Sequence, residues 1–295
     1  MGINLSLTVA ASVCAAHCFA SVFLENDLVR SGRPFRLIRA RHEALLVSGE
    51  ILLSTVGMRK LLSAQKAELQ KWMFKHTSVF NDELNEQPAR VAPYKIDMKQ
   101  DNNWHENTAN KAPPRWQMIT KQQEVKRFID MALKAKLIRP SNANAWSQVL
   151  LTPKPNGKWR FCLDFRNLNS QSKAGGWPIP NIKHVIERIS RTKARYFAVL
   201  DLTQGYYQML LDEASRHLTA FRTAFGVFEW NRLPMGLKGA GSYYQSHMQN
   251  TVLTDLLYKI CESYLDDILV YGSTKEELST NLQSVISRLE KFGMT

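Results

Sequence analysis

Cysteine is scarce in this sequence, and its scarcity narrows the class of protein. The 295 residues contain 4 cysteines, which are Cys14, Cys18, Cys162 and Cys261. Their spacing fits neither a zinc site nor the disulfide framework of a small secreted domain. Because disulfides persist mainly in oxidising compartments, we expect an intracellular protein, cytoplasmic or nuclear.

Long hydrophobic runs are also missing, except near the N-terminus. Residues 3–24 contain no Lys, Arg, Asp or Glu. This uncharged segment is long enough for a membrane span or for the apolar part of a signal peptide. No basic residue precedes the run, however, and its serines, Asn4, Thr8 and His17 lower its hydrophobicity. We therefore expect no membrane or secretory function. Residues 1–60 contain no aspartic-protease Asp-Thr-Gly or Asp-Ser-Gly, and we predict an unassigned, poorly ordered segment.

Acidic residues are depleted from one block of the chain. The formal net charge is +13 at pH 7, and residues 121–200 hold 16 Lys and Arg against 4 Asp and Glu, an excess of +12. Residues 201–295 hold 8 against 11, a balance of −3. A basic block binds polyanions by releasing their counterions. Residues 121–200 therefore suit nucleic-acid binding, although a generic basic surface has the same composition.

Two acidic motifs organise the second half of the chain. Asp266 and Asp267 stand between a short β-prone segment at 257–261 and an apolar run, a pattern that predicts a hairpin with both acids at its tip. The apolar run 196–201 ends in Asp201, as expected of a buried strand that delivers an acid at its C-terminal end. An Asp-Asp pair alone is also common in ordinary turns. The inference of a functional site therefore depends on the second motif, the strand that ends in Asp201.

If the two strands are neighbours, three carboxylates meet in one small volume. Like charges so close raise one another's pKa unless a cation neutralises them. Magnesium prefers a few carboxylates together with waters and substrate phosphates, and two ions roughly 3.5 to 4 Å apart can promote phosphoryl transfer. The sequence therefore predicts that Asp201, Asp266 and Asp267 are catalytic and bind two Mg²⁺ (or Mn²⁺) ions.

The amino-acid sequence around these acids resembles that of a known family. Leu200–Gln208 followed by Tyr264–Tyr271 is similar to the reverse transcriptase of gypsy-type LTR retrotransposon polyproteins, and the likeness extends over residues 75–295. It implies an α+β right-hand polymerase fold, with fingers and an antiparallel palm sheet backed by helices. It also implies RNA-directed DNA polymerase activity, which is a nucleotidyl transfer. The implied partners are an RNA or DNA template with primer, deoxynucleoside triphosphates, and the rest of a polyprotein, including ribonuclease H and integrase.

The resemblance assigns nucleotide-binding roles to residues outside the acidic motifs. Lys154 and Arg160 flank the Asn-Gly turn of a predicted hairpin and correspond to the pair that holds the triphosphate, which suits a guanidinium. Tyr206 corresponds to the aromatic ring that packs under the sugar and rejects a 2′-hydroxyl. Met235 is expected to contact the nucleotide. A solvated surface charge for either cation, and a core position for Tyr206, are the plain structural alternatives.

Nucleic acid is expected to contact Tyr264, Pro234 and Gly236. Residues 233–241 match the family's Met-Pro-Phe-Gly-Leu-x-Asn-Ala-Pro only in part, because Leu233 replaces Met, Met235 replaces Phe, Gly239 replaces Asn and Gly241 replaces Pro. These departures fall where template and nucleotide bases pack in the family.

The resemblance also divides the chain. Residues 61–120 are predicted to be a helical lead-in followed by an extended linker, residues 121–195 mainly fingers, and residues 196–295 mainly palm, with the thumb absent. Without a thumb the alternative function is a nucleic-acid-binding remnant that synthesises nothing. Another two-metal enzyme, such as a nuclease or an RNA-templated RNA polymerase, is the other class of candidate.

Helix signals support this division. Residues 121–137 carry an apolar stripe at helical spacing, and Asn181 is a predicted N-cap for a helix that ends near Ser190. Asp164 and Arg166 are expected to pair and brace the fingers. Thr274 and Glu277 form a capping box that predicts a C-terminal helix.

Overall fold

The structure, a computed structural model, describes residues 75–80, 84–153, 157, 159–173 and 175–295, together with the backbone of the paired strands β1 (Thr8–Ser12) and β2 (Phe19–Phe23). Two units are present, of which the first contains residues 179–203 and 247–295 and the second residues 83–178 and 204–246. The chain therefore enters each unit more than once. The labels fingers and palm, drawn as a single division after residue 195, remain predictions.

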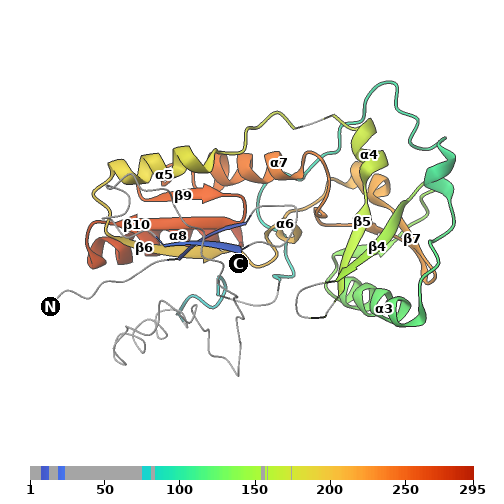
Figure 1. Cartoon of the computed structure of the whole chain (residues 1–295), viewed down its shortest axis with the longest axis horizontal. Helices are drawn as coiled ribbons and strands as arrows, with labels where there is room; N and C mark the ends of the chain where they lie inside the picture. Colours follow the sequence, from blue (N-terminus) through green and yellow to red (C-terminus); the bar gives the residue numbers. More distant parts are fainter. Residues whose placement is uncertain are drawn as a thin grey trace. The chain divides into compact units, whose positions relative to one another are not determined.

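An antiparallel three-stranded sheet is the centre of the first unit (Figure 1). Its strands are β6 (Tyr196–Asp201), β10 (Asp267–Gly272) and β9 (Cys261–Tyr264), in the order β6-β10-β9. The predicted hairpin is present, but the strand before its turn begins at Cys261. Residues 258–260 form a turn, because Tyr258 has a φ of 65° and a left-handed residue interrupts a strand.

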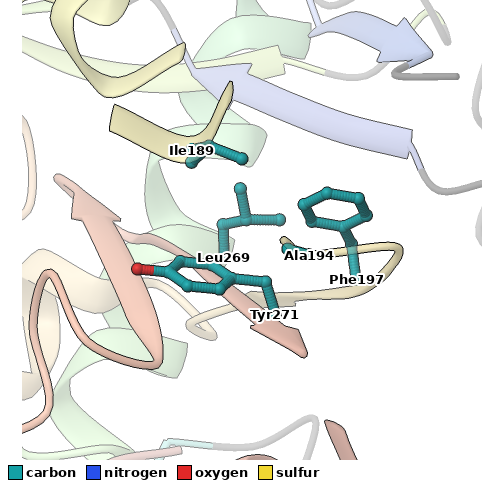
Figure 2. Close-up of a cluster of buried hydrophobic side chains, with 5 residues drawn as sticks. All are labelled: Ile189, Ala194, Phe197, Leu269 and Tyr271. Atoms are coloured by element: carbon teal, nitrogen blue, oxygen red, sulfur yellow. The ribbon is translucent and has the colours of Figure 1, made fainter. Parts of the chain in front are cut away.

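Helix α5 (Ile182–Arg191) covers one face of this sheet. It begins where expected, since the Asn181 side chain accepts a hydrogen bond from the Lys183 amide. Ile189 of α5 packs with Phe197 of β6 and with Leu269 and Tyr271 of β10 in a buried apolar cluster (Figure 2). Alternate residues of β6 and β10 therefore face α5.

Helix α8 (Lys275–Phe292) packs against β10 and β6. The Thr274 hydroxyl accepts a hydrogen bond from the Glu277 amide at 3.1 Å, which confirms the predicted cap. Its apolar residues Val285, Ile286 and Leu289 are fully buried. Like α5, this helix hides one apolar stripe, so the sheet has an apolar layer on each face.

A five-stranded mixed sheet forms the core of the second unit. Its order is β3-β8-β7-β4-β5, with β4 and β7 parallel and the other neighbours antiparallel. Helix α3 (Ile119–Lys134) carries the predicted stripe and packs through Phe128, which stacks on Phe161 with ring centroids 3.9 Å apart. The strand bounds are Ile138–Pro140 for β3, Ser147–Pro153 for β4, Trp159–Asp164 for β5, Phe221–Thr223 for β7 and Gly226–Trp230 for β8.

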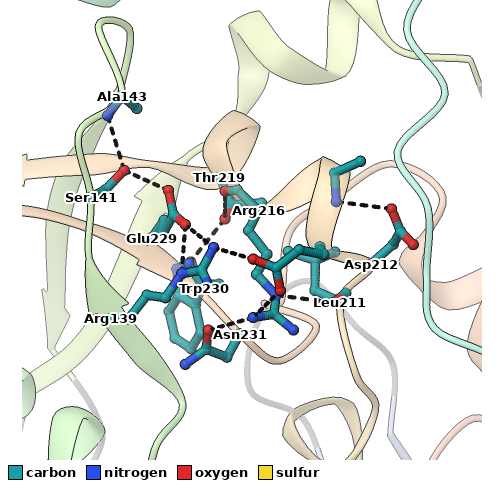
Figure 3. A network of polar contacts seen from close by, with 12 residues as sticks. Arg139, Ser141, Ala143, Leu211, Asp212, Arg216, Thr219, Glu229, Trp230 and Asn231 are labelled. Atoms are coloured by element: carbon teal, nitrogen blue, oxygen red, sulfur yellow. Dashed lines mark hydrogen bonds and ion pairs between the residues drawn. The ribbon is translucent and has the colours of Figure 1, made fainter.

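Ion pairs join the edge of this sheet to a neighbouring turn of helix (Figure 3). Arg139 of β3 lies opposite Glu229 of β8 and donates to its carboxylate at 2.8 Å. The same guanidinium contacts Glu213 at 2.6 Å, and Ser141 donates to Glu229 at 2.5 Å. Glu229 is buried but fully partnered, which is the condition for burying a charge without a large loss of stability.

Short elements complete the described chain. They are η2 (Thr108–Lys111), α4 (Arg166–Gln171), α6 (Gly205–Gln208), η3 (Glu213–Thr219), α7 (Ala240–His247) and the π-helical turn η4 (Met248–Val252). Residues 84–107 run mainly as loop. None of the helices in the described residues has the length and apolar character needed to cross a membrane.

Candidate active site

One row of side chains crosses the end of the three-stranded sheet. In the antiparallel register Asp267 of β10 is the partner of Asp201 on β6 and of Tyr264 on β9. Directly opposed residues of an antiparallel pair point to the same face. The side chains in this row, Tyr264, Asp267 and Asp201, therefore lie next to one another. They lie on the face that α5 covers, two residues along the strands from the apolar pair Val199 and Leu269.

The hydrogen-bond pattern brings the two aspartates of this row close together. The amide of Leu202 donates to the carbonyl of Asp266 at 3.0 Å, so these two residues form a hydrogen-bonded pair next to Asp201 and Asp267. Hydrogen-bonded and non-hydrogen-bonded pairs alternate along an antiparallel ladder, and side chains approach more closely in the second kind. Asp201 and Asp267 are therefore a non-hydrogen-bonded pair, and their side chains lie close together.

Asp266 is held in the two-residue turn between β9 and β10. Its neighbour Leu265 has a φ of 54°, a left-handed conformation that costs a non-glycine residue about 1 to 2 kcal/mol. Strained turn residues of this kind cluster at functional sites, where surrounding structure fixes them. The turn thus presents Asp266 beside the ends of β6 and β10.

The electrostatics of the three acids favour a bound cation. Burial, and to a smaller extent the nearby Asp266 carboxylate, together raise the pKa of Asp201 to about 6. Burial also raises the pKa of Asp266. The Asp201 side chain nevertheless keeps contact with solvent, whereas Asp267 is only 8% exposed. Crowded, partly desolvated carboxylates gain stability when a cation neutralises them.

The donor set suits magnesium better than a metal that needs a complete cage of side chains. Within the described residues, no group of three or more His, Cys, Asp or Glu side chains is arranged to hold a metal ion. Mg²⁺ commonly takes only one or two carboxylates and completes its shell with water and substrate phosphates. The neighbouring oxygens of Asp201 and Asp266 fit that requirement.

The predicted nucleotide-binding residues lie in the second unit. Arg160 is an exposed residue of β5 opposite Thr152 of β4, on the predicted hairpin. Lys154 falls outside the described residues. Tyr206 of α6 is 7% exposed and stacks on Tyr244, with ring centroids 5.1 Å apart. The tyrosine is therefore a core residue in this structure, and its role towards a sugar remains a prediction.

The turn after β8 holds the other predicted contacts. Met235 is 48% exposed and Pro234 is buried, while Gly236 has a φ of 98°, a conformation that suits glycine. The Asn169 side chain donates to the Gly236 carbonyl at 2.8 Å and accepts from the Lys238 amide at 2.8 Å. Asn169 thus fixes both sides of this turn, a role that nothing in the sequence pattern indicated.

Asp164 and Arg166 pair as predicted, at 2.8 and 2.7 Å through two guanidinium nitrogens. Arg115 approaches the same carboxylate at 3.5 Å. Arg166 lowers the pKa of Asp164, mainly through the hydrogen bonds between their side chains. These residues line a polar cavity of about 410 Å³ together with Asn167 and Ser170.

Comparison with known proteins assigns the family. Residues 152–295 match the family described as reverse transcriptase (RNA-dependent DNA polymerase), and this segment includes all three aspartates. Residues 152–295 are therefore similar in sequence to the reverse transcriptase family. The expectation drawn from the order of its motifs is thereby confirmed.

The relatives of this reverse transcriptase segment are polyproteins. The chain is 36% identical over 176 residues to the retrovirus-related Pol polyprotein from transposon opus of Drosophila melanogaster, covering 58% of this chain and 17% of the relative. It is 31% identical over 172 residues to the Pol polyprotein from transposon gypsy of the same organism, covering 56% of this chain and 16% of the relative. The chain therefore spans less than a fifth of either polyprotein.

Solved structures confirm the fold. The foamy viral protease-reverse transcriptase in complex with RNA/DNA hybrid has a TM-score of 0.64 at 20% identity, covering 79% of this chain and 30% of that one. The same enzyme in complex with double-stranded DNA has a TM-score of 0.66 at 22% identity, covering 79% and 47%. The α+β reverse transcriptase fold predicted from the sequence is thus the observed one.

Proposed function

We propose that this chain carries the catalytic carboxylates and nucleotide contacts of an RNA-directed DNA polymerase, the activity of a retrotransposon polyprotein. The single observation that supports this most strongly is the row formed by Asp201 and Asp267 with Asp266 in the adjoining turn. The substrates are deoxynucleoside triphosphates and a primer paired to an RNA or DNA template. Because such templates are copied inside the cell, a cytoplasmic or nuclear location follows from the proposal.

The carboxylates are the chemical centre of the proposal. Asp201, Asp266 and Asp267 would hold two Mg²⁺ ions, which would supply Lewis-acid stabilisation of the phosphate oxygens when bound. The primer 3′-hydroxyl oxygen attacks the α-phosphorus, the bond from that phosphorus to the bridging oxygen breaks, and pyrophosphate leaves while the hydroxyl proton passes to solvent. A proton on Asp201 competes with Mg²⁺ for the carboxylate, so its pKa of about 6 in the metal-free chain predicts weaker Mg²⁺ binding below about pH 6.

A second set of residues would bind and orient the nucleotide in this proposal. Arg160 and Lys154 hold the triphosphate, since the guanidinium of arginine matches phosphate geometry. Tyr206 closes the space beside the sugar 2′ carbon, and Met235 packs against the base. Tyr264, Pro234 and Gly236 contact the paired strands. Positioning of this kind is a large part of catalysis in phosphoryl transfer.

Magnesium binding tests the carboxylate assignment. Mg²⁺ is titrated by calorimetry into the wild-type chain, the Asp201→Asn/Asp266→Asn double variant and an Asp130→Asn control on α3, whose carboxylate pairs with Lys126 on the surface. We expect binding in wild type and control and its loss in the double variant. Equal weak binding by all three would remove the metal assignment.

Nucleotide binding tests the role of Arg160, and primer extension tests the polymerase activity. Arg160→Ala is expected to lose deoxynucleotide affinity while keeping template affinity, and Arg127→Ala on α3, which pairs with Glu124, serves as the control. Extension of a primer on an RNA template that disappears in Asp266→Asn would support polymerase activity. Template binding without any extension would favour the alternative, a nucleic-acid-binding chain without synthesis.

A further inference from the structure

Arg232, the residue just before the turn that carries Met235, is a buried charge with an unusual set of partners. It is 3% exposed. Its guanidinium donates to the carbonyls of Tyr207 and Gln208 at 3.3 Å each, and to those of Asn85 and Glu86 at 3.4 and 2.5 Å. All four acceptors are backbone carbonyls, and no carboxylate of the described residues forms an ion pair with it.

Burial of this charge is unfavourable by itself. The surrounding protein lowers the pKa of the Arg232 guanidinium, because desolvation disfavours its charged form. Carbonyl dipoles offset only part of the desolvation penalty of a buried ion. An apolar side chain would fill the same volume without that penalty, so the contacts of Arg232 must have another consequence.

That consequence is the joining of three chain segments. Tyr207 and Gln208 end helix α6, where carbonyls have no helical partner. Around them the Leu233 amide donates to the Met209 carbonyl at 3.0 Å, and the Ala89 amide donates to the Gln208 carbonyl at 2.8 Å. Arg232 thereby joins the end of α6 to residues 85–86 and to the segment after β8 in which Arg232 itself lies.

Two of the segments that Arg232 joins, α6 and the turn after β8, carry residues predicted to contact the nucleotide. Tyr206 immediately precedes the carbonyls that Arg232 holds, and Met235 lies three residues after Arg232. The planar guanidinium can serve several acceptors at fixed angles, whereas the lysine ammonium is a single flexible point charge. Arginine is therefore better suited than lysine to fix the relative positions of Tyr206 and Met235.

We infer that Arg232 is a positioning residue that sets the separation of the Tyr206 ring and Met235, and thereby the selection of deoxyribose over ribose. This inference rests on the proposed function. Sugar selection depends on whether a ring can exclude one oxygen atom, so a shift of about 1 Å is enough to alter it. Loss of Arg232 should affect discrimination between sugars more than it affects triphosphate binding at Arg160.

The test uses the full chain with primer–template and Mg²⁺. Arg232→Met removes the donors and the charge, Arg232→Lys keeps only the charge, and Arg139→Met is the control because it breaks a comparable set of contacts to Glu213 and Glu229 in the same unit. Hydrogen–deuterium exchange reports protection of residues 205–211 and 233–236. Titrations with dATP and ATP give the ratio of their affinities.

We expect faster exchange in those two segments for Arg232→Met and Arg232→Lys, and a fall of about tenfold or more in the preference for dATP. The Arg139→Met control should keep the wild-type exchange rates in those segments and the wild-type preference for dATP. Unchanged exchange in the Arg232 variants would overturn the inference, and so would faster exchange with an unchanged dATP preference, since that result describes a merely structural residue. A wild-type chain that binds neither nucleotide would instead defeat the proposed function, and the sugar-selection role with it.

Discussion

Asp267 of β10 lies directly opposite Asp201 of β6, on the same face of the sheet. Like charges in this relationship destabilise an antiparallel pair. Without divalent metal at pH 8, Asp201→Asn should therefore raise the free energy of unfolding by up to about 1 kcal/mol. Added Mg²⁺ should stabilise the wild type but not the variant, because a ligand stabilises only the state that binds it.

Thermal denaturation with and without EDTA measures this effect, and Asp130→Asn is the matched control. Asp130 pairs with Lys126 at an exposed site of α3, so its loss should lower stability by about 0.5 kcal/mol or less. An Asp201→Asn chain that is less stable than wild type under both conditions would contradict the expected repulsion.

The pH dependence of stability should have an unusual sign in this region. Asp201 has a folded-state pKa of about 6 against an ordinary value of 3.8. Between these two values the folded chain keeps a proton that the unfolded chain has released, so the contribution of Asp201 to stability falls as pH rises from about 4 to 6. Solvent reaches this carboxyl, so we expect a change of about 1 kcal/mol at most.

Denaturant unfolding of wild type and Asp201→Asn at intervals from pH 4 to 7 isolates this contribution. The difference between the two chains should grow in favour of the variant as pH rises and should level off above pH 6. A constant difference across the range would mean that the Asp201 pKa is not raised.

Much of the site was predictable because its signals are local. An apolar run ending in Asp201, an Asp-Asp turn, and caps at Asn181 and Thr274 each follow from a few neighbouring residues, and all of these elements are present. The order of the motifs then predicted the family. The start of β9 was misplaced, because the left-handed Tyr258 cannot be read from a β-prone composition. Asp267 was expected at the hairpin tip beside Asp266, but it is the first residue of β10 and is buried.

Contacts between distant residues were not predictable in the same way. Asn169 holds the turn at Gly236, and Arg232 reaches the carbonyls of residues 85 and 86. Asparagine and arginine at these places look like ordinary polar residues, since neither belongs to a periodic pattern. The interleaving of the two units likewise depends on long-range pairing that a single sequence does not specify.

An ion pair between the partly exposed Arg188 and the buried Glu262, on the α5 side of the sheet, should be important for stability. Arg188 donates to both oxygens of Glu262, at 3.0 and 2.7 Å, and Glu262 is 3% exposed. Arg188→Met leaves this carboxylate buried without its charged partner, so the free energy of unfolding should fall by about 3 kcal/mol. Chemical denaturation of the two chains measures the difference.

Arg191 on the same helix provides the control. It pairs with Glu187 in an exposed i,i+4 arrangement, so Arg191→Met should cost about 0.5 kcal/mol or less. Adding Glu262→Gln to Arg188→Met should recover part of the loss, because the unpaired charge is then gone. Equal effects of the two arginine substitutions would show that Glu262 does not depend on its partner.

Gly272 at the end of β10 should tolerate no side chain. A Cβ atom at this position would lie 2.6 Å from the backbone nitrogen of Leu278 in the first turn of α8. The neighbouring atoms are helix backbone and cannot rotate away, so Gly272→Ala should lower stability by about 1 to 3 kcal/mol, as overpacking of a core does.

Gly176→Ala is the control, since a Cβ there has no atom within 4 Å. That change should be neutral or stabilising by up to about 1 kcal/mol, because alanine reduces the freedom of the unfolded chain. The melting temperature of Gly272→Ala should therefore fall below that of the wild type, whereas that of Gly176→Ala should stay the same or rise. A Gly272→Ala chain that melts with the wild type would mean that α8 is not seated against β10 as closely as this contact requires.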